Sequence, residues 1–295
     1  MSTDLPLVSV GVPVYNGEGK LEATLQALID QDYQNLEIIV SDNASTDQTA
    51  AILEKFAAKD SRIRPIRQTR NIGAAANFVQ VLEQSKGEYF MWAASGDYWS
   101  RKYVGVLAEL LRQNAQAVLA VSHVGLIDGQ TGQLKNEFWH ADPKPTVGLS
   151  KADRILQHLS RNGNDLGTYG HLIYGLFRRH NLRESYRMLG DTSLDFGTDV
   201  LLLLLILSQG GLAVQPERIL WYRTGGSSTA FRFEDLSQWM EYRATCARLV
   251  LGMDLQGLGF DDLVRVHQAQ MKFIDQFTGA DSPYQASLIR QMLGE

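Results

Sequence analysis

Two aspartates stand directly after short apolar runs, and they are the strongest chemical signal in this sequence. Leu36-Glu37-Ile38-Ile39-Val40 leads into Ser41-Asp42, and Tyr89-Phe90-Met91-Trp92-Ala93-Ala94 leads into Ser95-Gly96-Asp97. Runs rich in β-branched and aromatic residues that stop at Asp, Asn, Ser or Gly indicate buried strands ending in polar loops. Open parallel sheets bind ligands beyond the carboxyl ends of their strands. The two carboxylates therefore predict one site for a nucleotide and its metal.

The segments around these aspartates alternate between strand and helix patterns. Strands are expected over Leu7 to Tyr15, Leu36 to Val40, Arg62 to Arg67, Glu88 to Ala94 and Ala117 to His123. Helices are expected over Lys20 to Gln31, after Asp47, from Asn71 to about Gln84, and over Tyr103 to Gln113. A repeated strand–helix order implies a parallel sheet with right-handed crossovers.

The alternation breaks down from about Val124. The sequence there predicts a strand pair and a loop over 125–150, a helix over Lys151 to Ser160, and a strand over Leu172 to Arg178. A loop from Leu194 enters a Leu-rich helix that runs to Gln209, a strand region covers Leu212 to Arg223, and helices follow from about Phe233. These last helices are open to three roles: a dimer interface, a contact with a membrane surface, or a structural brace.

Composition restricts the class of protein. The 295 residues are 44% hydrophobic and 21% charged, which is enough to bury a substantial core. A net charge of -5 and a pI of about 5.7 argue against a dedicated nucleic-acid binder, which needs a basic patch. Cys246 is the single cysteine, so no disulfide can form within the chain and no cysteine cluster can hold zinc. We expect Cys246 to be a small buried core residue.

No segment of the sequence has the pattern of a membrane span. The longest apolar stretch, Val200 to Leu207, is far shorter than the ~20 residues that a spanning helix needs. It predicts a wholly buried helix instead. Residues 1–6 lack the basic flank and long apolar core of a signal peptide. We expect a cytoplasmic protein, with peripheral attachment at the inner face of the membrane left open.

Several motifs occur in a characteristic order. They are Val8-Ser9-Val10-Gly11-Val12-Pro13-Val14-Tyr15-Asn16, Ser41-Asp42-Asn43-Ala44-Ser45-Thr46-Asp47, Arg70-Asn71-Ile72-Gly73 with Asn77, Gly87-Glu88-Tyr89, Thr198-Asp199, and Trp221-Tyr222-Arg223 with Gly226-Ser227. Together they resemble the inverting family-two glycosyltransferases of GT-A fold, over roughly residues 7–230. The resemblance implies an α/β fold, with a central, mostly parallel sheet flanked by helices and a C-terminal helical extension.

The resemblance also divides the chain. It implies a nucleotide-sugar-binding half over 1–123, an acceptor-binding half of the same domain over 124–232, and the helical extension over 233–295. It implies a hexosyltransferase that moves a sugar from a nucleoside-diphosphate donor to the hydroxyl of a sugar or glycolipid acceptor. A UDP-sugar is favoured because UDP-sugars are common in the family, and dTDP and GDP donors stay open. The setting expected is polysaccharide or glycoconjugate synthesis, and a homodimer stays open.

The resemblance assigns nucleotide-binding roles to residues in the first half. Asp42 is the candidate for the nucleotide base, because a carboxylate can accept a hydrogen bond from a ring N–H. Its alternative is a turn former that bonds its own backbone. The other candidates are Pro13, Val14, Tyr15, Asn71, Gly73 and Ser95. Helix capping explains Asp47 as well as a role in the site does. A solvated surface arginine explains Arg70 as well as a contact with the diphosphate does.

Two positions depart from the family pattern. Asp97 is the candidate ligand for Mg²⁺ or Mn²⁺, but Gly96 stands where the family carries a second acid. Asp199 is the candidate general base, with Asp195 as its substitute and helix capping as its alternative role. Thr198 replaces the first member of the usual acidic pair. Both departures support an alternative function, a catalytically degenerate nucleotide-binding module.

A nucleotidyltransferase on a related sheet is a further alternative. It would want a Gly-rich phosphate loop with Arg or Lys after the first strand. Val14-Tyr15-Asn16-Gly17-Glu18-Gly19-Lys20 lacks that pattern. The weaker candidates for acceptor or sugar contacts are His171, Trp92, Trp139, His140 and Trp221, since a structural or packing role is the more common one for each.

Overall fold

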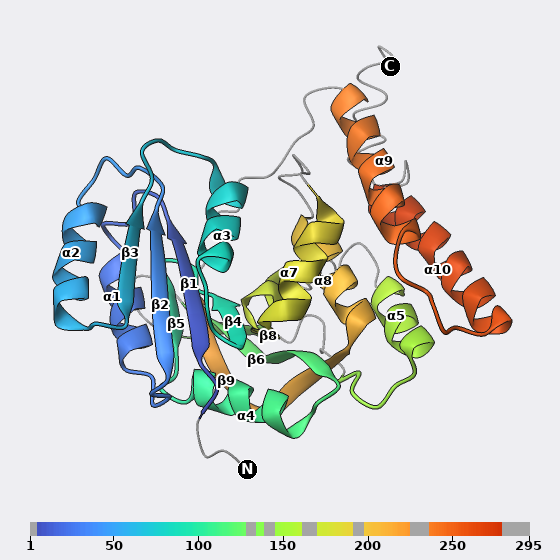
Figure 1. Ribbon diagram of the computed structural model, residues 1–295, viewed down its shortest axis with the longest axis horizontal. Helices are drawn as coiled ribbons and strands as arrows, with labels where there is room; N and C mark the ends of the chain where they lie inside the picture. The colour runs from blue at the N-terminus through green and yellow to red at the C-terminus, as the bar shows by residue number, and fades with distance from the viewer. Residues whose placement is uncertain are drawn as a thin grey trace.

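A computed structural model describes residues 5–127, 134–138, 145–160, 170–190, 198–224 and 236–278 (Figure 1). The first half alternates as expected. Its elements are β1 (Val8–Val14), α1 (Leu21–Ile29), β2 (Leu36–Asp42), α2 (Thr49–Lys59), β3 (Ile63–Arg67), α3 (Ala74–Glu83), β4 (Tyr89–Trp92), β5 (Asp97–Trp99) and α4 (Tyr103–Gln113). β2 runs two residues further than the sequence predicted, so Asp42 is the last residue of the strand.

The second half contains fewer parallel strands and more helix. Its elements are β6 (Ala117–Ile127), β7 (Leu134–Phe138), α5 (Lys151–Leu159), the 3₁₀ helix η1 (Gly170–Tyr174), β8 (Leu176–Arg178), α7 (Arg179–Leu189), α8 (Thr198–Gln209), β9 (Gly211–Thr224), α9 (Leu236–Leu251) and α10 (Phe260–Thr278). The expected strand pair is the antiparallel β6–β7 pair.

Two expectations about local structure were wrong, and one helix was missed. The strand predicted over Leu172 to Arg178 is the helix η1 followed by the short β8, because the chain turns where the amide of Gly175 bonds the carbonyl of Leu172. The helix α7 was missed, since its charged residues leave only Leu182, Ser185 and Leu189 buried. The loop after β4 was expected to stay irregular, yet Asp97 begins the three-residue strand β5.

The strands that the structure describes form one mixed sheet in the order β3-β2-β1-β4-β8-β6-β9-β5, with β7 beside β6. β1 lies parallel to both β2 and β4, and β2 lies parallel to β3. The register places Val14 opposite Asp42, and Asp42 opposite Arg67. The strand order reverses beside β1, which is the switch point where open α/β sheets bind ligands.

The sheet separates two apolar cores. Alternate residues of β1, such as Val10 and Val12, point into one core with α1, α2 and α4. The other core holds α3, α5, α7 and α8, with α9 and α10 as an outer layer (Figure 1). α3 packs closely on β1 because Gly11 has no side chain: a Cβ there would lie 2.6 Å from Cγ2 of Val81.

The Leu-rich helix α8 lies inside the second core. Every residue from Val200 to Ser208 is buried, as the sequence predicted. In the described residues, none of the helices is both long and apolar enough to cross a membrane. Cys246 is fully buried, again as expected.

A buried carboxylate ties the first three strands together at the end of the sheet away from Asp42. Glu37 on β2 accepts hydrogen bonds of 2.6 Å from Ser9 Oγ, from the amide of Lys86 and from Arg64 on β3. Burial raises the pKa of Glu37, but these hydrogen bonds lower it by more, so its pKa lies below the ordinary value. Ser9 Oγ also accepts from the amide of Gly87, which precedes β4.

We therefore predict that Glu37→Gln lowers the free energy of unfolding at pH 7 by about 1–3 kcal/mol. A carboxylate whose pKa is lowered by folding stabilises the fold at pH values above its unfolded pKa of 4.5. This contribution is lost as the pH falls below 4.5, so the difference in unfolding free energy between Glu37→Gln and the parent protein should close in acid. Denaturant titrations at several pH values measure this. Glu22→Gln removes an exposed pair with Lys55 and should change nothing measurable. A gap that persists at low pH would contradict the charge-based explanation.

Candidate active site

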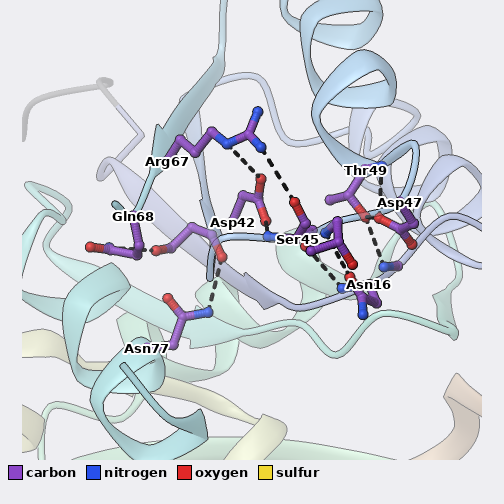
Figure 2. Close-up of polar contacts among 11 residues, drawn as sticks. Asn16, Asp42, Ser45, Asp47, Thr49, Arg67, Gln68 and Asn77 are labelled. Atoms are coloured by element: carbon purple, nitrogen blue, oxygen red, sulfur yellow. Dashed lines mark hydrogen bonds and ion pairs between the residues drawn. The ribbon is translucent and has the colours of Figure 1, made fainter. Parts of the chain in front are cut away.

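The candidate site lies at the carboxyl ends of β1, β2 and β4. Asp42 is 1% exposed there, and its two carboxylate oxygens have different surroundings. Oδ1 accepts a hydrogen bond of 2.9 Å from the amide of Ser45 (Figure 2). Oδ2 lies 3.6 Å from Nε of Arg67 and is buried, and none of the described residues donates a hydrogen bond to it. Asp42 is thus a turn former through one oxygen and offers a buried acceptor through the other.

Hydrogen bonds join the loop after β1 to the loop after β2. The amide of Asn16 donates to Ser45 Oγ at 2.9 Å, and the amide of Thr46 donates to Asn16 Oδ1 at 3.0 Å (Figure 2). The amide of Gly17 donates to Thr49 Oγ1 at 2.8 Å. Asn16 adopts a φ of 49°, a conformation that asparagine tolerates better than most residues. The two loops therefore hold each other in place beside Asp42.

Asp47 takes part in this junction as a structural carboxylate. Oδ1 accepts from both the amide and the hydroxyl of Thr49 at the start of α2, and Oδ2 accepts from the amide of Glu18 at 3.0 Å. Burial raises the pKa of Asp47, but these hydrogen bonds leave it below the ordinary value. These bonds form a turn that leads into α2 and not the helix cap that the sequence offered, since the N-cap position is Gln48, which makes no side-chain cap hydrogen bond.

A third loop is held by Asn43. Its Nδ2 donates to Asn71 Oδ1 at 3.0 Å and to the carbonyl of Gly73 at 3.1 Å, and its Oδ1 accepts from the amide of Ile72 at 2.8 Å. Gly73 has a φ of 87°, which favours glycine. Asn71 and Gly73 are both exposed, so they border the candidate site as a fixed rim.

The remaining nucleotide candidates differ in exposure. Val14 is buried and Pro13 is partly buried, while Tyr15 is 50% exposed. Ser95 Oγ is buried and finds no hydrogen-bond partner among the described residues. A Cβ at Gly17 would lie 3.5 Å from that hydroxyl, so Ser95 adjoins the loop after β1.

Asp97 is 2% exposed and is fixed through Thr24 of α1. Thr24 Oγ1 accepts from the amide of Gly96 at 2.9 Å and donates to the carbonyl of Asp97 at 3.4 Å. Burial, followed by the charge of Asp97, raises the pKa of Tyr103. No group of three or more His, Cys, Asp or Glu gathers for a metal ion in the part of the chain that the structure describes. A single carboxylate fits a cation held mainly by phosphate oxygens.

Asp199 lies in the first turn of α8 and is partly buried. Burial raises its pKa, and the hydrogen bond of 2.8 Å from the amide of Val200 offsets only part of that effect. Burial and the charge of Asp199 also raise the pKa of Tyr186. The ring of Tyr186 meets the ring of Trp92 edge-on at 6.0 Å, and Trp92 ends β4. Tyr186 therefore packs on the strand that precedes Asp97 and is also affected by the charge of Asp199.

Sequence reasoning missed several residues of this arrangement. Arg67 was found only as the end of a strand, although its place opposite Asp42 follows from strand register. Asn43, Thr24 and Tyr186 carried no signal, because their partners are distant in sequence. Arg70 is exposed, and His171 is half-buried in η1. Trp139, His140 and Asp195, and the side chain of Trp221, lie outside the described residues.

Comparisons with known proteins agree on one family. The family model described as Glycosyl transferase family 2 matches residues 9–179. The putative teichuronic acid biosynthesis glycosyltransferase TuaG of Bacillus subtilis is 32% identical over 207 residues, 63% of this chain and 81% of TuaG. The UDP-Glc:alpha-D-GlcNAc-diphosphoundecaprenol beta-1,3-glucosyltransferase WfaP of Escherichia coli is 39% identical over 95 residues, 32% of this chain and 37% of WfaP.

A solved structure shares the fold. The S. aureus TarS structure of residues 1–349 with UDP-GlcNAc superposes with a TM-score of 0.72 at 18% identity, over 97% of this chain and 77% of that one. The α/β fold expected from the sequence, with its helical C-terminal extension, is confirmed.

The backbone offers a reason for the glycine that replaces a family acid. Gly96 has a φ of 103°, a region that L-residues adopt only with strain. We predict that Gly96→Asp lowers the free energy of unfolding by about 1–2 kcal/mol in thermal or denaturant unfolding. The control is Gly19→Asp, at a position where a Cβ meets nothing within 4 Å. Equal stability of Gly96→Asp and the parent protein would show that the backbone does not require glycine.

Proposed function

The chain belongs to glycosyl transferase family 2, and we propose that it transfers a hexose from a UDP-sugar to a hydroxyl acceptor with inversion at the anomeric carbon. The observation that carries the proposal is the buried Oδ2 of Asp42, to which none of the described residues donates a hydrogen bond. The donor in the name of WfaP and the UDP-GlcNAc of the TarS structure support a uridine nucleotide. The name of TuaG supports polysaccharide synthesis as the setting.

The two oxygens of Asp42 favour uracil over guanine. Oδ1 already accepts from the amide of Ser45, so Oδ2, which accepts no hydrogen bond from the described residues, is the oxygen best placed to accept from a base. Uracil presents one ring N–H between two carbonyl groups, and guanine presents a ring N–H beside an amino group, which calls for two acceptors. Arg67, 3.6 Å from Oδ2, supplies a donor for a neighbouring uracil carbonyl. Pro13, Val14 and Tyr15 wall the base.

We assign the diphosphate to the exposed rim formed by Asn71 and Gly73 and to the loop that follows β4. Asn71 and Gly73 border the nucleotide, and the hydroxyl of Ser95, which has no hydrogen-bond partner in the described part of the chain, supplies a further hydrogen bond. Asp97 would hold a divalent cation, Mg²⁺ or Mn²⁺, together with phosphate oxygens of the donor. Such a cation, when bound, neutralises the charge that develops on the diphosphate leaving group.

Asp199 is assigned the role of general base. Its carboxylate takes the proton of the acceptor hydroxyl as that oxygen forms a bond to the anomeric carbon and the bond from this carbon to the diphosphate breaks. Attack on the face opposite the leaving group inverts the configuration. The raised pKa of Asp199 suits a base, because it strengthens the affinity of the carboxylate for the proton.

For the acceptor we assign only a chemical class, and for the location only a compartment. WfaP names a diphosphoundecaprenol-linked acceptor, and this supports a sugar or glycolipid hydroxyl acceptor for this chain. A cytoplasmic position with peripheral contact at the inner face of the membrane would give access to such an acceptor. The second candidate function is a nucleotide-binding module without turnover, which Gly96 favours because the metal loop keeps one carboxylate.

We predict that Asp42→Asn weakens UDP binding about 10- to 100-fold in calorimetry, since the amide group places a donor against the ring N–H of uracil. The asparagine oxygen can still accept from Ser45, so the turn should survive. Cytosine carries an acceptor in place of that N–H, so CDP is an internal control. Its binding should improve relative to UDP in the variant. An unchanged ratio of UDP to CDP affinity would remove Asp42 from base recognition.

We predict that Asp199→Asn reduces turnover of the preferred UDP-hexose about 10²- to 10⁴-fold without weakening UDP binding. Release of UDP from a panel of nucleotide sugars, with candidate acceptors supplied, measures turnover. A carboxylate with a raised folded pKa destabilises the fold above that pKa, so the variant should be at least as stable as the parent at pH 7.5. The stability gap should close as pH falls toward the ordinary value of 3.8.

The same panel tests the proposed function as a whole. Metal-dependent turnover of a UDP-sugar that Asp97→Ala abolishes supports transfer. UDP binding without metal dependence, and without turnover of any donor, favours the binding module. Full turnover in Asp199→Asn would contradict the assignment of the base.

A further inference from the structure

α10 exposes a row of apolar side chains on its outer face. Phe260 is 79% exposed, Leu263 37%, Val264 40% and Met271 44%. We call these four residues the α10 stripe. Their spacing of three, four and seven residues places them on one side of a helix. The exposed surface is on the order of 400 Å², comparable to the largest apolar patch on a typical monomer.

The helix that carries the stripe is firmly packed. Val266 and Phe273, which point away from the stripe, are buried in the core, as is Ile274 near the end of the helix, and Gln270 Nε2 donates to the carbonyl of Val250 on α9 at 2.6 Å. Arg265 pairs with Asp153 of α5 at 3.3 Å. Figure 1 shows α9 and α10 at the end of the molecule opposite β1, β2 and β3. The stripe is therefore a fixed surface remote from the candidate site.

Charges beside the stripe indicate what covers it. Asp261 and Lys272 are both exposed, and each follows an end residue of the stripe. They are eleven residues apart, close to three helical turns, so they flank the stripe on the same side. In an antiparallel pair of α10 helices, Phe260 lies opposite Met271 of the second copy, and Asp261 comes beside Lys272 of the second copy. The two-fold axis creates this pair twice, whereas parallel helices do not create it.

The same charges disfavour an anionic membrane surface. Asp261, Asp262 and Asp275 outnumber Arg265 and Lys272 on this helix, and Arg265 is already paired with Asp262 and Asp153. Anionic lipids attract basic helices.

We propose that the chain self-associates through the α10 stripe, as an antiparallel two-fold pair of α10 helices. The contact is smaller than the ~800 Å² per partner of a standard interface, so the dimer is weak, with a dissociation constant in the micromolar range. This inference does not depend on the proposed function.

Sedimentation equilibrium of the full chain from about 1 to about 100 µM tests it. The parent protein should shift from monomer to dimer over this range. Val264→Glu should weaken the dimer more than about 10-fold, because it places two like charges at the centre of the contact. Leu5→Glu changes a residue of similar exposure, 50%, near the other terminus and should leave the dimer unchanged. Circular dichroism checks that each variant is folded.

A charge exchange tests the antiparallel arrangement. Asp261→Lys and Lys272→Asp should each weaken self-association about 3- to 10-fold, since each sets like charges opposite one another. An equimolar mixture of the two variants should recover the dimer, because each then supplies the charge that the other needs. A parent protein that stays monomeric, a dimer insensitive to Val264→Glu, or a mixture no better than its components would each overturn the proposal.

Discussion

The candidate site depends on the parallel register between β1 and β2. That register places Val14 opposite Asp42, and pairing with β3 brings Arg67 to the same level. The loops after β1 and β2 can then exchange hydrogen bonds through Asn16 and Ser45. A shift by one residue would turn Val10 and Val12 away from their core and would separate Asn16 from Ser45. Apolar burial thus fixes the positions of the polar groups.

Stability and function place opposite demands on the carboxylates. Glu37 receives three hydrogen bonds and has a lowered pKa, so it stabilises the sheet far from the site. Asp42 keeps one buried oxygen to which none of the described residues donates a hydrogen bond, and Asp199 has a raised pKa. Groups left incompletely satisfied are unfavourable for folding and are typical of places where a ligand completes the hydrogen bonds.

Sequence reasoning predicted what depends on local pattern. The apolar alternation located β1 and β2 and therefore the strand end at Asp42, and the run of leucines located α8. It could not find Asn43 or Thr24, whose hydrogen-bond partners lie far along the chain. β5 was too short to show a period, and α7 carries too few apolar residues. The φ of Gly96 gives a departure from the family pattern a backbone explanation that composition could not offer.

The central claim is that Oδ2 of Asp42, which accepts no hydrogen bond from the described residues, receives the base of a uridine nucleotide. A crystal structure of the chain with UDP and Mn²⁺ tests it most directly. The account predicts the uracil ring N–H within hydrogen-bond distance of Asp42 Oδ2, the ring beside Tyr15, and the diphosphate directed toward Asp97. A nucleotide bound elsewhere, or a uracil ring that leaves Oδ2 without a partner, would contradict it.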